Sequence, residues 1–180
     1  MKPIFLCGFM GCGKSTIGRI LAKKLNCKCV DLDKYIEKKE GMTIPEIFKE
    51  KGEPYFRELE TKALEEFADI GGVVATGGGA LLSEHNGETA KKSGLVVFID
   101  TDFETCYERI KNDPHRPIAY SSTKEQLKER FDTRSPLYRA HSHITVNGGF
   151  PPMRIVQKIY GYYIKQNKIS CKKVRKSSET

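Results

Sequence analysis

The sequence predicts an α/β fold built on a parallel β-sheet with helices on both faces. Short apolar runs alternate with longer amphipathic segments, which is the pattern of repeated strand–helix units. The first unit carries a glycine-rich segment between its strand and its helix, a position typical of nucleotide-binding loops. A chain of 180 residues is long enough to bury one core but short for two. We therefore expect a single domain over residues 1–180.

Five short apolar runs are the candidate strands of this sheet. Polar segments of helical length separate them, so successive strands can run parallel. The runs are Pro3–Cys7, Lys28–Asp31, Val73–Thr76, Leu95–Asp100 and His143–Val146.

Apolar residues at helical spacing predict the helices between these strands. The first helix begins near Lys14 and carries a buried stripe of Ile17, Ile20, Leu21 and Leu25. Further helices are expected over residues 86–92, 102–111, 124–134 and 152–166.

Two helices are expected between the second and third strands. Thr43 and Glu46 have the spacing of a capping box, which opens a short helix that stops before Gly52. Pro54 opens the next helix, whose buried face contains Phe56, Leu59, Ala63 and Phe67. The segment Asn112–Thr123 is polar, contains two prolines and lacks periodicity, so it predicts a mobile loop.

The positive charge is concentrated at one end of the chain. Residues 165–180 contribute +5 of the net charge of +8, which predicts a solvated basic tail over about residues 167–180 rather than a nucleic-acid interface. No apolar run approaches the roughly 20 residues that span a bilayer, and the first residues lack a signal-peptide pattern. Six cysteines without metal-site spacing are then expected to be free thiols of a cytoplasmic protein.

Residues 8–15 match the Walker A pattern, with an apolar strand before them and an amphipathic helix after them. Glycines let backbone N–H groups curl around phosphate oxygens, and the helix N-terminus favours the anion. Lys14 would reach the β- and γ-phosphates, and the hydroxyl of Ser15 would join a Mg²⁺ coordination shell. Cys12 is either a thiol activated by Lys14 and the helix N-terminus or a small inert apolar residue.

Two further motifs follow the second and third strands. Asp31 and Asp33 are two residues apart at a strand end, where side chains point to the same face, so both carboxylates are expected in the ligand crevice. The glycines of Thr76-Gly77-Gly78-Gly79 would let a substrate approach bare backbone amides. The alternatives are a solvated turn for the first motif and an ordinary flexible turn for the second.

Three arginines are candidates for binding anions. Arg134 shares a helical face with Leu127 and Phe131, just before Ser135-Pro136, which predicts the end of that helix. Arg57 follows Phe56 near the start of another helix. A small anionic acceptor would explain both, because a guanidinium matches a carboxylate bidentately. Arg116, in the polar loop, could close over the transferring phosphate.

Taken together, these motifs resemble the shikimate kinase family. The resemblance covers about residues 3–165 and rests, in order, on Gly8–Thr16, Asp31-Leu32-Asp33, Phe56-Arg57, Gly77-Gly78-Gly79, Arg116-Pro117 and Arg134-Ser135-Pro136-Leu137-Tyr138-Arg139. It implies a five-stranded parallel sheet of the P-loop, nucleoside-monophosphate-kinase type. It also implies a substrate-binding helical region over about residues 33–62 and a mobile lid over about residues 112–123.

The resemblance further implies an activity and its residues. The γ-phosphate of ATP would pass to the 3-hydroxyl of shikimate, with Mg²⁺ as cofactor, giving shikimate 3-phosphate and ADP on the route to chorismate and aromatic amino acids. The ATP site would comprise Gly11, Cys12, Gly13, Lys14, Ser15, Thr16, Arg109 and Arg116. The shikimate site would comprise Asp33, Arg57, Gly77, Gly78, Gly79 and Arg134. Asp33, Lys14 and Arg116 would be catalytic, and Ser15 and, through water, Asp31 would hold the metal.

Three other functions are alternatives to this one. A gluconate-type kinase and a nucleoside-monophosphate kinase share the Walker A loop, but neither explains the triple glycine together with two arginines. A nucleic-acid-binding P-loop protein would explain the pI of about 9.1, although most of the surplus charge lies in the tail. We expect a monomer whose partners are ATP and shikimate, without nucleic acid or membrane.

Overall fold

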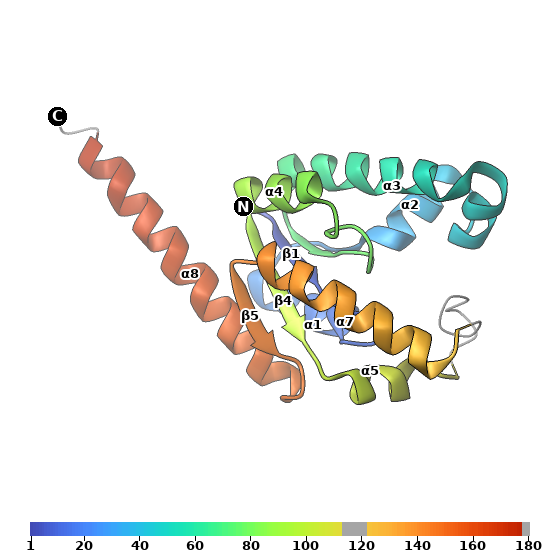
Figure 1. Ribbon diagram of the computed structural model, residues 1–180. Helices are drawn as coiled ribbons and strands as arrows, with labels where there is room; N and C mark the ends of the chain where they lie inside the picture. Colours follow the sequence, from blue (N-terminus) through green and yellow to red (C-terminus); the bar gives the residue numbers. More distant parts are fainter. Residues whose placement is uncertain (113–121, 178–180) are drawn as a thin grey trace.

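The computed structural model describes residues 1–112 and 122–177, with side chains as far as Asn167 (Figure 1). Its centre is a parallel five-stranded sheet with the strand order β2-β3-β1-β4-β5. Each strand lies within one residue of an expected one, so the predicted α/β fold is confirmed. The strands are β1 (Ile4–Cys7), β2 (Cys29–Asp31), β3 (Val73–Ala75), β4 (Leu95–Asp100) and β5 (Ile144–Asn147).

The middle of the sheet is the core of the protein. Ile4 of β1 lies between Val73 of β3 and Leu95 of β4, and the pairing continues in register along the three strands. Side chains on both faces of β1 are buried, which is the environment of a central parallel strand and explains its continuous apolar sequence.

Helices cover both faces of the sheet. One face is covered by α1 and α8, which pack against each other, and α3, α4 and α7 lie on the other (Figure 1). Because the strand order reverses beside β1, the loop that follows β1 opens into the crevice where doubly wound folds bind ligands. The helices are α1 (Lys14–Leu25), α2 (Leu32–Glu40), α3 (Ile44–Ile70), α4 (Glu84–Ser93), α5 (Phe103–Ile110), α7 (Lys124–Ala140) and α8 (Pro152–Ser177).

The predicted break within α3 is confirmed. The backbone N–H of Thr43 donates to the carboxylate of Glu46 at 2.7 Å, which completes the expected capping box. Gly52 has a non-helical backbone with φ of 83°, so α3 consists of two helices joined at a kink, and Pro54 opens the second. The second of these helices carries Arg57.

The last helix is longer than the sequence predicts. Its expected end near residue 166 is wrong, because α8 continues to Ser177 and extends away from the sheet (Figure 1). No glycine or proline follows Gly161 before Ser177, so nothing in this stretch terminates a helix. Among the described residues, no helix is both long enough and apolar enough to cross a membrane.

Candidate active site

The Walker A loop forms a cradle at the start of α1. Gly13 is the N-cap of this helix and supplies no side-chain cap, so the first N–H groups of α1 can bind an anion. The ammonium of Lys14 turns back over the loop and donates to the carbonyls of Gly8 at 2.8 Å and Phe9 at 3.0 Å. These bonds hold the positive charge of Lys14 at the centre of the cradle.

Residues of the β4–α5 connection and of α5 fix the shape of this loop. Gly11 has a φ of +81°, and a Cβ at this position would lie 2.7 Å from the carbonyl oxygen of Cys106, so only glycine fits. The buried hydroxyl of Thr101 donates to the carbonyl of Cys12 at 3.1 Å. Cys12 is 1% exposed, and its Sγ lies 3.7 Å from Lys14 Nζ. Such burial favours the interpretation of Cys12 as a small packing residue.

The two residues expected at a metal ion lie next to each other. Asp31 ends β2, and its carboxylate accepts a hydrogen bond of 2.9 Å from the hydroxyl of Ser15 at the start of α1. A hydroxyl and a carboxylate beside a phosphate cradle provide the oxygen ligands that Mg²⁺ prefers. This pair therefore fits the ion that a P-loop nucleotide brings with it.

The predicted geometry of Asp33 is wrong. β2 ends at Asp31 and α2 begins at Leu32, so Asp33 lies in the first turn of a helix and not on a strand. The helix begins here because Leu32 and Ile36, one turn apart, are both buried. The carboxylate of Asp33 instead lies against Gly77, where a Cβ would overlap it.

Both aspartates nevertheless line one cavity of about 440 Å³ with the phosphate cradle. Its wall includes Lys14, Asp33, Gly78 and Arg109, and the guanidinium of Arg109 donates to the carbonyl of Gly11 at 3.0 Å. Phe150, between β5 and α8, also lines this cavity. The cavity thus joins the expected nucleotide residues to the first of the expected substrate residues.

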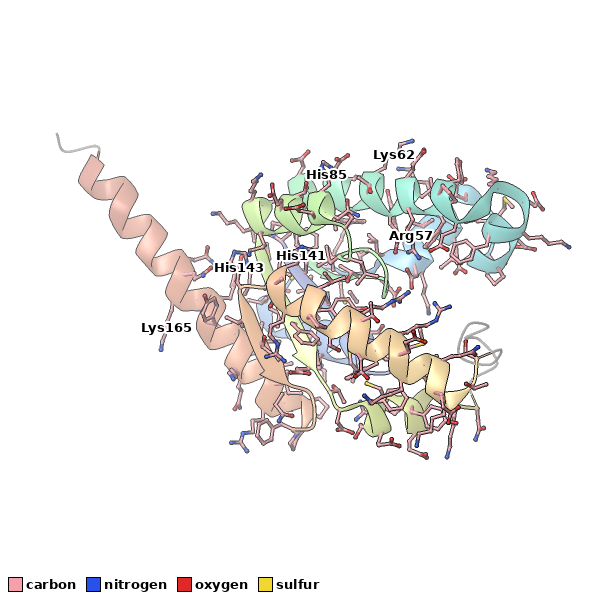
Figure 2. All side chains as sticks on the ribbon, in the orientation of Figure 1. Arg57, Lys62, His85, His141, His143 and Lys165 are labelled. Atoms are coloured by element: carbon pink, nitrogen blue, oxygen red, sulfur yellow. The ribbon has the colours of Figure 1, made fainter. Side chains whose placement is uncertain are left out.

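Arg57 lies in a second cavity, of about 750 Å³, and is paired with two carboxylates of α3. Its Nη1 is 2.5 Å from Glu60, and its Nε and Nη2 both donate to Glu53. Figure 2 shows Arg57 on the inner side of α3, whereas Lys62 points away from the molecule. A guanidinium has five N–H groups, so two N–H groups of Arg57 remain for a ligand after these three bonds. Gly79 lies directly against Arg57, so a side chain at that position would displace the guanidinium.

Arg134 faces the same glycine segment from the opposite side. Its Nη1 lies 3.4 Å from the carbonyl of Gly78, and it lines the second cavity with Arg57. The predicted helix end at Ser135-Pro136 is wrong, because α7 continues to Ala140 with Pro136 inside it. The helix continues because Tyr138, in the next turn, is fully buried. Pro136 cannot donate a hydrogen bond to the carbonyl of Asp132, but Asp132 is exposed, so water can bind that carbonyl instead.

The triple glycine brings the predicted substrate residues together. Gly77 contacts Asp33, Gly78 contacts Arg134 and Gly79 contacts Arg57, while Gly78 lines the first cavity and Gly79 the second. Gly77 and Gly79 leave no room for a side chain, and Gly78 accepts a hydrogen bond through its backbone carbonyl. The segment is therefore a wall of the site and not a loose turn. Arg116 and the central part of the expected lid lie outside the described residues.

Sequence reasoning missed Glu60, which is 1% exposed in the second cavity. It follows Phe56 by four residues and precedes Ala63 by three, so it lies on the apolar stripe that defined this helix. An acidic residue on such a stripe, three residues after an arginine, is the signal that could have identified it. Burial raises the pKa of Glu60 to about 7, although the adjacent Arg57 guanidinium opposes this shift.

We expect Glu60 to make the stability of the protein decrease as the pH rises from 4.5 to about 7. In this range the folded protein binds a proton that the unfolded chain has released, so the free energy of unfolding falls with pH, by on the order of 3 kcal/mol in total. Urea unfolding at several pH values in this range measures the effect. Glu60→Gln should flatten this slope.

Glu58→Gln is the matched control, since Glu58 is exposed on the same helix and should leave the wild-type slope unchanged. If Glu60→Gln kept the full wild-type slope, the buried carboxyl would not be the group that titrates.

A phosphate cradle at the end of β1, an oxygen pair suited to Mg²⁺ and an arginine-lined cavity beside them define a P-loop phosphotransferase for a small anionic acceptor. Comparison with known proteins narrows this class. Residues 10–163 match the sequence model of the shikimate kinase family, which covers most of the chain. The chain therefore belongs to the shikimate kinase family.

Individual relatives agree with this assignment. The chain is 48% identical over 161 residues to the shikimate kinase of Sulfurihydrogenibium sp., covering 88% of this chain and 96% of that protein. It is 45% identical over 163 residues to the shikimate kinase of Persephonella marina, covering 89% and 98%. Among solved structures, shikimate kinase from Acinetobacter baumannii in complex with shikimate has a TM-score of 0.85 and 38% identity, covering 92% of this chain and 94% of that one.

Proposed function

We propose that this protein transfers the γ-phosphate of ATP to the 3-hydroxyl of shikimate, releasing ADP and shikimate 3-phosphate for the synthesis of chorismate and aromatic amino acids. One observation carries the proposal: the triple glycine is in contact with Asp33, Arg57 and Arg134 and borders the phosphate cradle. A carboxylate and two guanidiniums around bare backbone suit a small acid that also carries hydroxyls. The related structure that binds shikimate supports the same substrate.

In this proposal the protein acts mainly by positioning groups and neutralising charge, because the transition state of phosphoryl transfer is loose. Lys14 and the N-terminus of α1 bind the phosphates, and a phosphate oxygen replaces one of the loop carbonyls that Lys14 contacts. Arg134 and the two remaining N–H groups of Arg57 hold the substrate carboxylate. Asp33 orients the reacting hydroxyl and accepts its proton. Arg116 closes over the transferring phosphate.

The cofactor we propose is Mg²⁺, held by the hydroxyl of Ser15 directly and by Asp31 through water. The 2.9 Å separation of these two oxygens beside the cradle fits such an ion. When bound, Mg²⁺ neutralises phosphate charge and orients the β- and γ-phosphates. Ser15 and Asp31 then serve to hold the nucleotide in one orientation relative to Asp33.

We propose that the protein is a cytoplasmic monomer. Within it, we propose that residues 33–62 form the substrate-binding region. Among the residues with described side chains, Cys7, Cys12, Cys27, Cys29 and Cys106 are free thiols, as is usual in a reducing compartment.

A coupled assay of ADP release tests the function. Shikimate, gluconate, AMP and an oligonucleotide are compared as acceptors at equal concentration with MgATP, and we expect turnover with shikimate alone. A preference for gluconate or AMP would assign the protein to one of the rival kinase reactions. ATP hydrolysis stimulated by the oligonucleotide would favour the nucleic-acid-binding alternative.

A further inference from the structure

The carbonyl of Gly78 accepts hydrogen bonds from two residues of α7 that are one turn apart. Tyr138 donates its hydroxyl at 2.5 Å, and Arg134 approaches with Nη1 at 3.4 Å. Tyr138 is 0% exposed, and its burial raises the pKa of the phenol, so the hydroxyl remains a donor. The shorter and better buried bond therefore belongs to Tyr138, which lies beyond the cavity wall and not in the cavity.

The position of this turn of α7 depends on contacts outside the helix. Pro136 has no N–H, so α7 lacks the backbone hydrogen bond from residue 136 to the carbonyl of Asp132, in the turn that carries Arg134. Arg139, the residue after Tyr138, pairs with Asp100 at the end of β4 at 2.7 Å, and the ring of Tyr138 packs on Phe98 of the same strand. Tyr138 thus connects this weakened part of α7 to both the sheet and the triple glycine.

We propose that Tyr138 is a positioning residue for substrate binding. Its hydroxyl fixes the Gly78 carbonyl against α7 and so sets the distance between Arg134, which would hold the substrate carboxylate, and the triple glycine, which forms a wall of the site. This role rests on the proposed function for the identity of the substrate. If the wild-type protein failed to use shikimate, the proposed function would fail; the test below compares variants of a protein that does use it.

Tyr138→Phe removes only the hydroxyl and keeps the buried ring. Loss of one partner leaves a buried carbonyl with only the longer Arg134 contact, so we expect KM for shikimate to rise about 5- to 100-fold. KM for ATP and kcat should change little, because Tyr138 does not line the cavity that contains the phosphate cradle and Asp33. Tyr163→Phe is the matched control. Tyr163 is a buried residue of α8 that lines neither cavity, and its hydroxyl also donates to a backbone carbonyl, that of Lys2. This variant should keep wild-type kinetics.

A double-mutant cycle with Arg134→Lys separates positioning from general destabilisation. Lysine keeps the positive charge but lacks the guanidinium fork, whose distance from the triple glycine Tyr138 is proposed to set. Tyr138→Phe should therefore weaken shikimate binding far less in the Arg134→Lys background than in the wild type. Binding is measured by calorimetric titration, and the thermal midpoint is recorded for every variant. An unchanged KM in Tyr138→Phe would overturn the proposal. Equal losses in both backgrounds, or parallel increases in KM for shikimate and ATP, would also overturn it by making Tyr138 merely structural.

Discussion

Replacing Asp33 with asparagine should reduce turnover with shikimate by more than about 100-fold, the scale of lost general-base catalysis. Asparagine is nearly isosteric and can still contact Gly77, so the wall of the site should persist, but it cannot accept the proton of the reacting hydroxyl. The Mg²⁺ concentration required for half-maximal rate should barely change. Steady-state kinetics with varied shikimate and Mg²⁺ measure both quantities.

Asp31→Asn is the matched control, since Asp31 lines the same cavity but pairs with Ser15. We expect this variant to shift the Mg²⁺ dependence, because its carboxylate would hold metal-bound water. If Asp31→Asn lost turnover at saturating Mg²⁺ while Asp33→Asn shifted the metal requirement, the two roles would have to be exchanged.

The sheet could be predicted from the sequence because its central strands are buried on both faces. Such strands must be apolar along nearly their whole length, so the sequence predicts the strand Leu95–Asp100 with the same boundaries that the structure shows. The capping box at Thr43 and the interruption at Gly52 were also predictable, since both depend on local backbone chemistry.

Two of the three errors in secondary structure, those at Asp33 and at Ser135-Pro136, arise where tertiary packing decides the conformation. The sequence gives no break after Asp31, yet burial of Leu32 and Ile36 makes the chain helical at once, which is how Asp33 reaches Gly77. Ser135-Pro136 is a genuine local signal for a helix end. The burial of Tyr138 and its bond to Gly78, 60 residues away in sequence, outweigh that signal.

The site was only partly predictable for a related reason. Motifs identify residues that face a ligand, so the glycines and arginines could be proposed from their types and spacing. Glu60 and Tyr138 act on other protein groups and carry no ligand motif. Glu60 pairs with Arg57 within one helix, where its place on the apolar stripe is a signal in the sequence, but its contact with Gly77 is visible only in three dimensions. The bond of Tyr138 to Gly78 likewise joins distant parts of the chain, so helical periodicity does not reveal it.

Replacing Arg134 with alanine should weaken shikimate binding by about 30- to several-thousand-fold, since loss of one partner of a desolvated charge pair costs roughly 2–5 kcal/mol. Arg134 should matter more than Arg57. Its guanidinium has a long contact with the carbonyl of Gly78 and interacts with the hydroxyl of Tyr138, whereas three N–H groups of Arg57 already bind the carboxylates of Glu53 and Glu60. ATP affinity should change little, because Arg134 lines the second cavity and not the phosphate cradle.

Arg57→Ala should produce a smaller loss within the same range, by a mixed route. It removes two N–H groups from the substrate and also leaves the buried Glu60 without its partner, so the stability of this variant should fall together with its affinity. Arg134→Ala should lose affinity with much less change in unfolding free energy. Comparing the two variants therefore distinguishes a residue that holds the substrate from one that also completes a buried ion pair.

Arg130→Ala controls for the change in net charge, because Arg130 is exposed on α7 about one turn before Arg134. Its loss should reduce shikimate affinity only slightly, and added salt should screen that effect. Titration of shikimate and ATP into the three variants by calorimetry completes the comparison. If both Arg134→Ala and Arg57→Ala bound shikimate as the wild type does, the arginines would not hold the carboxylate. If Arg130→Ala lost as much affinity as Arg134→Ala, attraction by the overall positive field would explain binding, and the contact of Arg134 with the triple glycine would have no role in it.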